Sequence, residues 1–169
     1  MPATPDDLFQ KLDALGVAHA TVTHPPLRTV EDSQSLRGEL PGGHAKNLFL
    51  KNKKGALFLL VAEETAPVRL KEFGKSVGAG ALSFAKPDLL MAALGVIPGA
   101  VTPFALINAA PGAVAVFFDQ ALLACDPLNF HPLDNTMTTT VSRDGLLAFL
   151  AGLGHNYRTT DFATPQASA

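Results

Sequence analysis

Hydrophobic and polar residues follow helical spacing in some segments of the chain and strand spacing in others. Leucines three or four positions apart between residues 8 and 15 predict a helix. The sequence Thr-Pro-Asp-Asp at residues 4–7 is a capping pattern for its start, and Gly16 marks its end. Residues 19–24 predict a short strand that is closed by two prolines. The chain is therefore expected to begin with a helix followed by a strand.

The clearest strand pattern lies in the next part of the chain, after one more predicted helix. A second capping pattern predicts a helix over residues 29–37, and the glycines and proline of residues 38–43 predict a loop. Two apolar runs at residues 47–50 and 56–62 then flank the polar sequence Lys-Asn-Lys-Lys-Gly at residues 51–55. This arrangement predicts a β-hairpin.

The remaining pattern predicts three helices and three strands. The helices are expected at residues 70–77, 87–94 and 142–153, and a glycine follows each of them. The strands are expected at residues 105–108, 113–118 and 138–141. Residues 95–103, with two glycines and two prolines, predict a loop in front of the first of these strands.

These elements predict a single α/β domain with a mixed, largely antiparallel sheet and surrounding helices. Hairpins as well as helices connect the strands, which argues against a doubly wound parallel sheet. The chain has 169 residues, of which 47% are hydrophobic and 17% charged, enough to build one core. We assign residues 1–158 to the domain and expect the small, polar residues 159–169 to form a flexible tail.

Several classes of protein do not fit the composition. The apolar runs are too short to cross a bilayer, and the N-terminus has neither the basic nor the apolar stretch of a secretory signal. A single cysteine, Cys125, cannot form an internal disulfide, which fits a reducing, cytoplasmic compartment. Cys125 lies beside an apolar run, and we interpret it as a small core residue rather than a nucleophile.

The charge pattern leaves two interpretations open. The net charge is −2 and the pI about 6.2, so the chain as a whole does not attract nucleic acid. Four basic residues nevertheless fall in one short window, at Lys46, Lys51, Lys53 and Lys54. From charge alone this window is better explained as the solvated end of a hairpin than as a phosphate-binding patch.

Common catalytic motifs are missing from the sequence. There is no G-x-S-x-G elbow, no phosphate-binding P-loop and no G-x-G-x-x-G sequence. The glycines at residues 78 and 80 follow a predicted helix rather than a strand, so we interpret them as a helix terminus. The five histidines are scattered and lack zinc-ligand spacing, so no metal site is predicted.

Three polar features stand out against the apolar background. Lys46 and Asn47 open an apolar strand, where a lysine suits either an exposed strand edge or contact with a phosphate or oxyanion. Residues 99–103, Gly-Ala-Val-Thr-Pro, form either a plain connection or a loop that lets a ligand approach the backbone. His131 lies in a turn-like segment and could hold a substrate hydroxyl, relay a proton or bond the turn itself.

In their order along the chain these features resemble the YbaK/prolyl-tRNA synthetase-associated domain family of editing deacylases, and most closely its freestanding alanyl-tRNA(Pro) deacylases. The resemblance covers roughly residues 24–153. It rests on five blocks: His24-Pro25-Pro26 with Thr29-Val30-Glu31; residues 44–51, His-Ala-Lys-Asn-Leu-Phe-Leu-Lys; residues 78–85, with Gly-Ala-Gly and Leu-Ser-Phe-Ala; residues 95–104, with Gly-Val and Pro-Gly-Ala-Val-Thr-Pro-Phe; and residues 130–139, with Phe-His-Pro-Leu, Asn135 and Thr138-Thr139.

The resemblance implies an α/β editing fold that hydrolyses the aminoacyl ester of a mischarged tRNA, without a metal or another cofactor. The family's lysine falls on Lys46, for which we expect a catalytic role facing the Gly-x-x-x-Pro loop. The expected substrate-binding residues are Asn47, Gly99, Thr102, Pro103 and His131. Lys51, Lys53 and Lys54 become candidates for contact with tRNA phosphates. The expected partner is the acceptor end of proline tRNA, with transient association with prolyl-tRNA synthetase or an elongation factor.

Two alternatives stay open beside hydrolysis of Ala-tRNA(Pro). The enzyme could act on a different mischarged amino acid, such as cysteine, serine or threonine. The chain could also be a module that binds tRNA or a synthetase without turnover. An aminoacyl ester is already activated, so an oriented water and a stabilised oxyanion would suffice for hydrolysis, and no covalent nucleophile is required.

Overall fold

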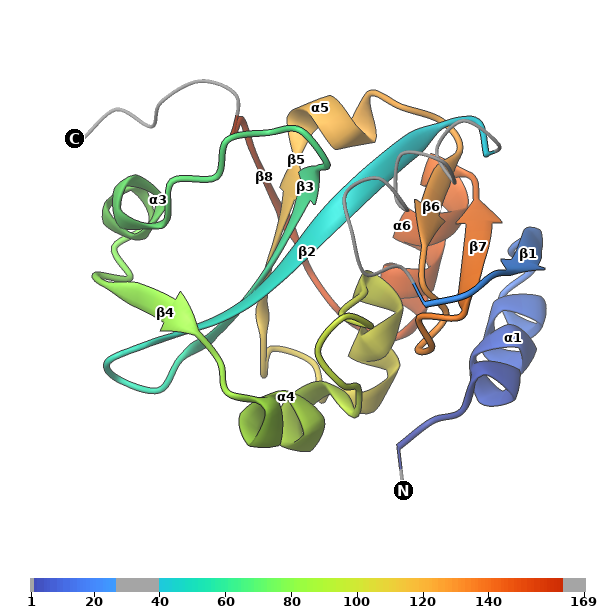
Figure 1. Ribbon diagram of the computed structural model, residues 1–169, viewed down its shortest axis with the longest axis horizontal. Helices are drawn as coiled ribbons and strands as arrows, with labels where there is room; N and C mark the ends of the chain where they lie inside the picture. Colours follow the sequence, from blue (N-terminus) through green and yellow to red (C-terminus); the bar gives the residue numbers. More distant parts are fainter. Residues whose placement is uncertain (1, 27–39, 163–169) are drawn as a thin grey trace.

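A computed structural model describes residues 2–26 and 40–162, and Figure 1 shows their arrangement. The helix expected over residues 29–37 lies outside the described residues. Within the described ranges, no helix is long and apolar enough to cross a membrane.

Eight strands form one mixed sheet. Its order is β1-β7-β6-β2-β3-β5-β8, and β4 pairs with β2 beside this path. Four of the seven pairings are antiparallel, and β2–β6, β3–β5 and β5–β8 are parallel. The strands are β1 (His19–Thr23), β2 (Gly43–Asn52), β3 (Leu57–Glu63), β4 (Leu82–Phe84), β5 (Ala115–Asp119), β6 (Leu128–Phe130), β7 (Met137–Val141) and β8 (Arg158–Thr160).

The long strand β2 joins the two halves of the sheet, as Figure 1 shows. On one edge it pairs with β3 over most of its length. On the other edge it pairs with β6 only at Gly43 and His44, and with β4 only from Leu50 to Asn52. Among the described strands, none pairs with this second edge between residues 45 and 48. The edge is therefore open in the middle of β2.

The local sequence explains where the helices begin, and one of them replaces a predicted strand. They are α1 (Pro5–Ala14), α3 (Leu70–Ser76), α4 (Pro87–Leu94), α5 (Gln120–Leu123), α6 (Arg143–Gly152) and the 3-10 helix η1 (Pro103–Asn108). Thr4 and Asp7 form the expected capping box of α1. The strand predicted at residues 105–108 is wrong, because Thr102 caps Phe104 and Pro103 begins a helical turn there instead.

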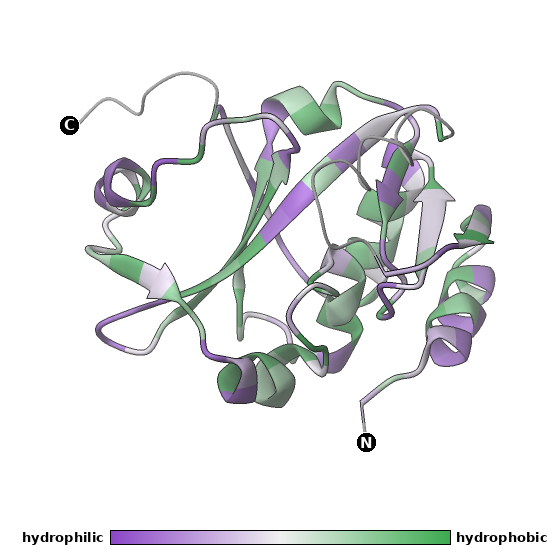
Figure 2. Ribbon diagram, viewed as in Figure 1, coloured by the Kyte–Doolittle hydropathy of each residue, from purple (hydrophilic) through white to green (hydrophobic). Residues whose placement is uncertain are grey.

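Two apolar clusters cover the opposite faces of the central strands. The larger cluster contains Phe49, Leu59 and Val61 and packs against α1, α4, η1, α5 and α6. The smaller one contains Leu50 and Leu60 and packs against α3. Odd-numbered residues of β2 therefore face the larger cluster and even-numbered ones face the smaller, as strand alternation requires. Figure 2 shows that β3 and β5 are apolar along their length, consistent with burial on both faces.

The C-terminal part of the domain extends further than the sequence predicted. Thr159 and Thr160 belong to β8, which pairs with β5, and Phe162 is buried in the smaller cluster. The predicted start of a flexible tail at residue 159 is therefore wrong for residues 159–162. The short elements β4, α5, β6 and β8 were not predicted, because each has only three or four residues and three of the four depend on pairing with distant strands.

Candidate active site on the polar face of β2

A row of polar side chains lies on the face of the sheet opposite the larger cluster. Asn129 of β6 is buried and lies 3.5 Å from His44 of β2, its partner across the parallel pairing. The Oδ1 atom of Asn129 accepts a hydrogen bond of 2.6 Å from the hydroxyl of Thr140 on β7. These contacts tie three strands together through polar groups. We call this surface the polar face.

Two histidines lie at the far end of the polar face. Nε2 of His24 is 2.8 Å from the hydroxyl of Thr138, and its ring centroid is 6.0 Å from that of His131. Nδ1 of His131 lies 2.8 Å from the carbonyl oxygen of Met137. Because a carbonyl oxygen only accepts, this Nδ1 carries the hydrogen and leaves Nε2 of neutral His131 as the free acceptor.

The surroundings of His131 keep its ring neutral. Burial lowers the pKa of His131 below its ordinary value, and the neighbouring His24 acts in the same direction. The hydrogen bond to Met137 and the carboxylate of Asp134 raise that pKa, but they do not offset the burial. Asp134 itself is held ionised, because hydrogen bonds from the side chain and backbone of Thr136 lower its pKa. A neutral imidazole next to a carboxylate suits the binding of a polar substrate group.

Lys46 shares the polar face with these residues. It follows His44 by two positions on β2, and it pairs with Ala62, a member of the smaller cluster. Its side chain is half-buried and makes no ion pair or side-chain hydrogen bond within the described residues. Lys46 stands where the edge of β2 is open, between the pairings with β6 and β4. Within the described residues, the half-buried Lys46 therefore lies at a break in the strand pairing of this edge.

The side chain of Asn47 leaves β2 on the face opposite to that of Lys46. It pairs with Val61 and so points towards the larger cluster, which also contains Ala100 beside Gly99. Its Oδ1 atom is buried, and no protein group in the described residues donates a hydrogen bond to it. Strand alternation directs Asn47 rather than Lys46 towards the larger cluster, and the placement of Lys46 opposite the Gly-x-x-x-Pro loop stays a prediction.

The Gly-x-x-x-Pro loop is built as a rigid connection. Gly99 has a φ of 90°, which favours glycine, and a Cβ placed there would lie 3.5 Å from Nδ2 of Asn135. Thr102 is fully buried and accepts a hydrogen bond from the backbone N–H of Phe104, and Pro103 begins η1. The loop thus meets the turn that follows His131 through Gly99 and Asn135.

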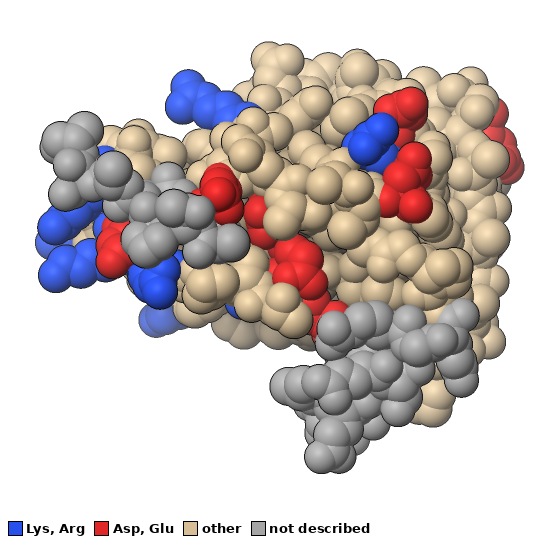
Figure 3. Space-filling model, turned by 90° about the horizontal axis from the view of Figure 1, so that it is seen from above, with Lys and Arg blue, Asp and Glu red and all other residues tan. Residues whose placement is uncertain are grey.

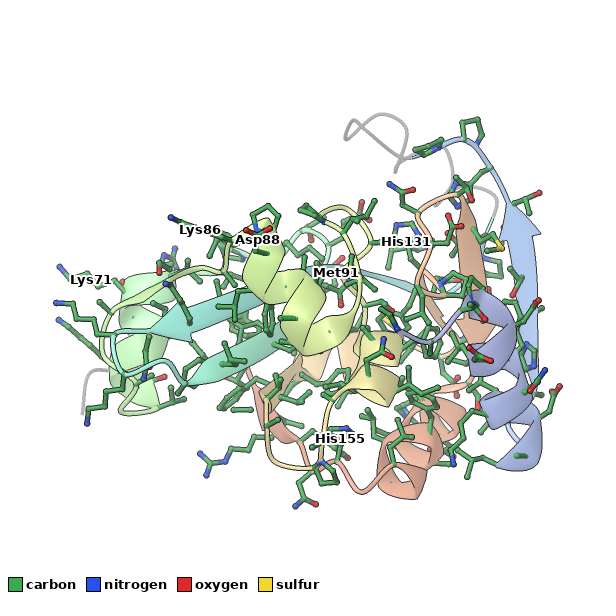
Figure 4. The ribbon with its side chains drawn as sticks, turned by 90° about the horizontal axis from the view of Figure 1, so that it is seen from below. Lys71, Lys86, Asp88, Met91, His131 and His155 are labelled. Carbon is green, nitrogen blue, oxygen red and sulfur yellow. The ribbon has the colours of Figure 1, made fainter. Side chains whose placement is uncertain are left out.

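A cavity of about 270 Å³ lies between this loop and that turn. Its lining is mostly apolar, with one carboxylate and one amide. The lining residues are Met91, Gly95, Val96, Ile97, Ala100, Leu133, Asp134 and Asn135. Figure 4 shows Met91 on α4 between the labelled Lys86 and His131.

The lysines of the hairpin lie away from this cavity. Lys51 is on β2 opposite Ser83 of β4, and Lys53 and Lys54 are exposed at the turn. Oδ1 of Asn52 accepts hydrogen bonds from the backbone N–H groups of Lys54 and Ala56 and so fixes the turn. Figure 3 shows that blue side chains gather at the end of the molecule that carries this hairpin.

The structure therefore brings the predicted residues together in two groups. Lys46 and His131 share the polar face, whereas Asn47, Gly99, Thr102 and Pro103 belong to the side of the larger cluster. His24, Asn129 and Thr138 were missed as members of the site. His24 and Thr138 lie in blocks that resemble the family and Asn129 precedes one, but their contacts with His44 and with each other link distant segments of the chain. The described residues contain no group of three or more His, Cys, Asp or Glu side chains that could hold a metal ion.

Comparison with known proteins identifies the class to which this fold and site belong. Residues 24–149 match the family described as the aminoacyl-tRNA editing domain, and the chain belongs to that family. The prolyl-tRNA editing protein ProX of Acetoanaerobium sticklandii is 32% identical over 152 residues, which cover 89% of this chain and 93% of that protein. The prolyl-tRNA synthetase associated domain-containing protein 1 of Mus musculus is 34% identical over 155 residues, with coverage of 89% and 91%.

A solved structure agrees on the fold. A crystal structure described as a candidate trans-editing enzyme for prolyl tRNA synthetase matches with a TM-score of 0.70 at 20% identity. The match covers 95% of this chain and 98% of that one. The predicted fold class, a single mixed α/β domain of the editing type, is confirmed.

Proposed function

We propose that this protein hydrolyses the aminoacyl ester of a mischarged tRNA, with Ala-tRNA(Pro) as its substrate. The observation that carries the proposal is Lys46, a cation without an ion-pair partner in the described residues, next to a break in the sheet and on the same face as neutral His131. Membership in the aminoacyl-tRNA editing domain family supports this reading of the site.

The proposed reaction uses water as the nucleophile. Water adds to the ester carbonyl, the bond from that carbon to the ribose oxygen breaks, and the ribose oxygen takes a proton. The products are the free amino acid and uncharged tRNA. Lys46 stabilises the oxyanion or anchors the terminal nucleotide, since an ammonium group serves either role with three donors. The vicinal ribose hydroxyl of the substrate helps to orient or activate the water.

The other predicted residues position the substrate in this proposal. The backbone of Gly99 approaches the ribose and the reacting carbonyl, and Thr102 and Pro103 keep the loop in place. The buried Oδ1 of Asn47 is an acceptor ready for a donor such as the substrate's ammonium group. Nε2 of His131 accepts from a substrate hydroxyl, because its Nδ1 is engaged with Met137.

Alanine is the proposed amino acid because of the likeness to the alanyl-tRNA(Pro) subgroup. The apolar cavity beside Gly99 suits a small side chain, and a close-fitting wall there would reject proline by bulk. Its volume alone does not separate alanine from cysteine, serine or threonine. The choice among these is therefore decided by experiment.

The hairpin lysines supply the proposed contacts to tRNA. Lys51, Lys53 and Lys54 lie at one end of a molecule whose net charge is −2, so binding should be weak and sensitive to salt. We place the reaction in the cytoplasm, where tRNA is charged, with prolyl-tRNA synthetase or an elongation factor as a transient partner. The name of the Mus musculus relative supports the association with prolyl-tRNA synthetase.

A panel of mischarged tRNAs tests the proposal. Proline tRNA charged with alanine, cysteine, serine, threonine or proline is incubated with purified protein, and the released amino acid is measured. We expect fastest release of alanine and no release of proline. Fastest release of a different amino acid would show that the enzyme is specific for that amino acid. Tight binding of the charged tRNAs without any release would show that the protein is a binding module and not an enzyme.

A further inference from the structure

The charged residues of this molecule are divided unevenly along the chain. Residues 46–86 contain eight basic and three acidic residues, a net charge of +5, whereas the whole chain has −2. Figure 3 shows the basic side chains gathered at one end, and Figure 4 labels Lys71 and Lys86 there. We call this region the basic end. Its lysines are Lys51, Lys53 and Lys54 of the hairpin, Lys71 and Lys75 of α3, and Lys86 before α4.

An exposed aromatic ring stands among these lysines. Phe84 of β4 is 60% exposed, which is more than any other large hydrophobic side chain in the described residues. Leu82, two residues earlier on β4, packs against the smaller cluster, whereas the side chain of Phe84 is exposed. An exposed aromatic ring near basic side chains is the combination by which proteins hold single-stranded RNA, through base stacking and phosphate contacts.

The backbone around Phe84 is held in place. Phe84 pairs with Leu50 and Ser83 pairs with Lys51 across β2 and β4. The backbone N–H of Ala85 donates a hydrogen bond of 3.0 Å to the carbonyl of Phe49, which extends the pairing by one residue. The ring is thus presented from a fixed strand rather than from a loose loop.

The pairing also sets the position of Phe84 relative to Lys46. Leu50 and Lys46 are both even-numbered residues of β2, so Phe84 lies on the same face of the sheet as Lys46. Leu50, the partner of Phe84, lies four residues from Lys46 along β2, or about 13 Å. The open edge of β2 lies between them. A strand of nucleotides leaving Lys46 along this edge would meet Phe84 and then the lysines of the basic end.

We propose that Phe84 is a stacking platform for an unpaired base of the RNA 3′ end, with Lys86, two residues further along the chain, at a flanking phosphate. This inference rests on the proposed function, because the ester-bearing nucleotide is placed at Lys46. Every base offers a flat face to an aromatic ring, so the platform holds the single-stranded end without reading its sequence. The lysines add an attraction that depends on salt. A protein partner fits less well, since protein interfaces are depleted in lysine.

Two substrates separate the platform from the catalytic site. The first is Ala-tRNA(Pro), and the second is the alanyl ester of adenosine, which lacks the preceding nucleotides. We expect Phe84→Ala to lower kcat/KM on the tRNA by about 5- to 150-fold, the range given by loss of one base–aromatic stack. The same variant should leave hydrolysis of the adenosine ester unchanged. Phe84→Trp should restore the rate on tRNA.

Binding of RNA without an ester gives a second readout. A labelled single-stranded oligonucleotide ending in CCA is titrated by fluorescence anisotropy against wild type, Phe84→Ala and Tyr157→Ala. Tyr157 is a matched control, because it is 37% exposed and packs on Phe118 away from the polar face. We expect only Phe84→Ala to weaken binding, and to do so less when the oligonucleotide is paired in a duplex.

The outcomes distinguish this inference from the proposed function. Unchanged activity and binding in Phe84→Ala would overturn the platform while leaving the deacylase intact. An equal loss on tRNA and on the adenosine ester would also overturn it, since the ring would then act on the catalytic site. A changed oligomeric state in Phe84→Ala with unchanged RNA binding would assign the ring to a protein contact. Failure of wild type to release any amino acid would overturn the proposed function, and the oligonucleotide titration would still test the platform.

Discussion

Lys46 and Asn47 are consecutive residues of β2 whose side chains leave the strand on opposite faces. Lys46 shares its face with His44, and Asn47 points towards the larger apolar cluster. The substrate proposed here must therefore meet both at the open edge of β2, where no described strand pairs with residues 45–48. This relationship predicts different consequences for the two positions when each is substituted.

Replacing the lysine should remove activity and spare the fold. Lys46 makes no ion pair or side-chain hydrogen bond in the described residues, so Lys46→Ala should change the free energy of unfolding by less than about 1 kcal/mol. Loss of a group that stabilises developing charge should lower kcat by about 100- to 1,000-fold. Single-turnover release of alanine and urea denaturation measure the two effects. Lys11→Ala on α1 is the control, and full activity in Lys46→Ala would refute the assigned role.

Replacing the asparagine should have the opposite effect on stability. No group in the described residues donates a hydrogen bond to the buried Oδ1 atom of Asn47, which costs about 1–3 kcal/mol. Asn47→Leu, which has a similar shape, should therefore raise the free energy of unfolding by about 1 kcal/mol and reduce activity at least tenfold. Denaturation in urea and deacylation of Ala-tRNA(Pro) are measured on the same preparation. A variant that is both less stable and fully active would show that the amide serves the fold.

The glycine of the loop can be tested against a glycine elsewhere. Gly99 and Gly112 have φ values of 90° and 80°, and a Cβ at either position meets no close contact. Alanine at each should destabilise the fold by about 1–2 kcal/mol through the same backbone strain. Only Gly99→Ala should also lose activity, because only Gly99 adjoins the proposed site. Thermal unfolding and deacylation are measured for both variants. Equal losses of stability together with equal losses of activity would contradict the placement of Gly99 at the site.

The sequence predicted the long elements of the fold, but not on which face of the sheet each candidate site residue lies. The helical stripe of α1 and the strand β3 have strong local patterns and were predicted at nearly their observed bounds, whereas β2 begins four residues before the run predicted at 47–50. The run Leu48, Phe49 and Leu50 is apolar at every position, so it carries no alternation from which the direction of Lys46 could be inferred. Likewise, nothing local to His131 indicates that His24 lies beside it, since that contact depends on the pairing of β1 with β7.

The histidine of the polar face predicts a dependence on pH. Burial lowers the pKa of His131 below its ordinary value of about 6.5, so the folded protein binds this proton less readily than the unfolded chain. The contribution of His131 to stability is therefore constant above about pH 6.5 and is lost as the pH falls from there through the folded pKa. The ring signal of His131, followed by NMR, should titrate with a midpoint below 6.5. His131→Gln, which keeps a hydrogen-bonding side chain without the titration, should lose less stability between pH 7 and pH 5 than wild type. A midpoint above 6.5, or an unchanged acid dependence in the variant, would show that the carboxylate of Asp134 outweighs burial at this site.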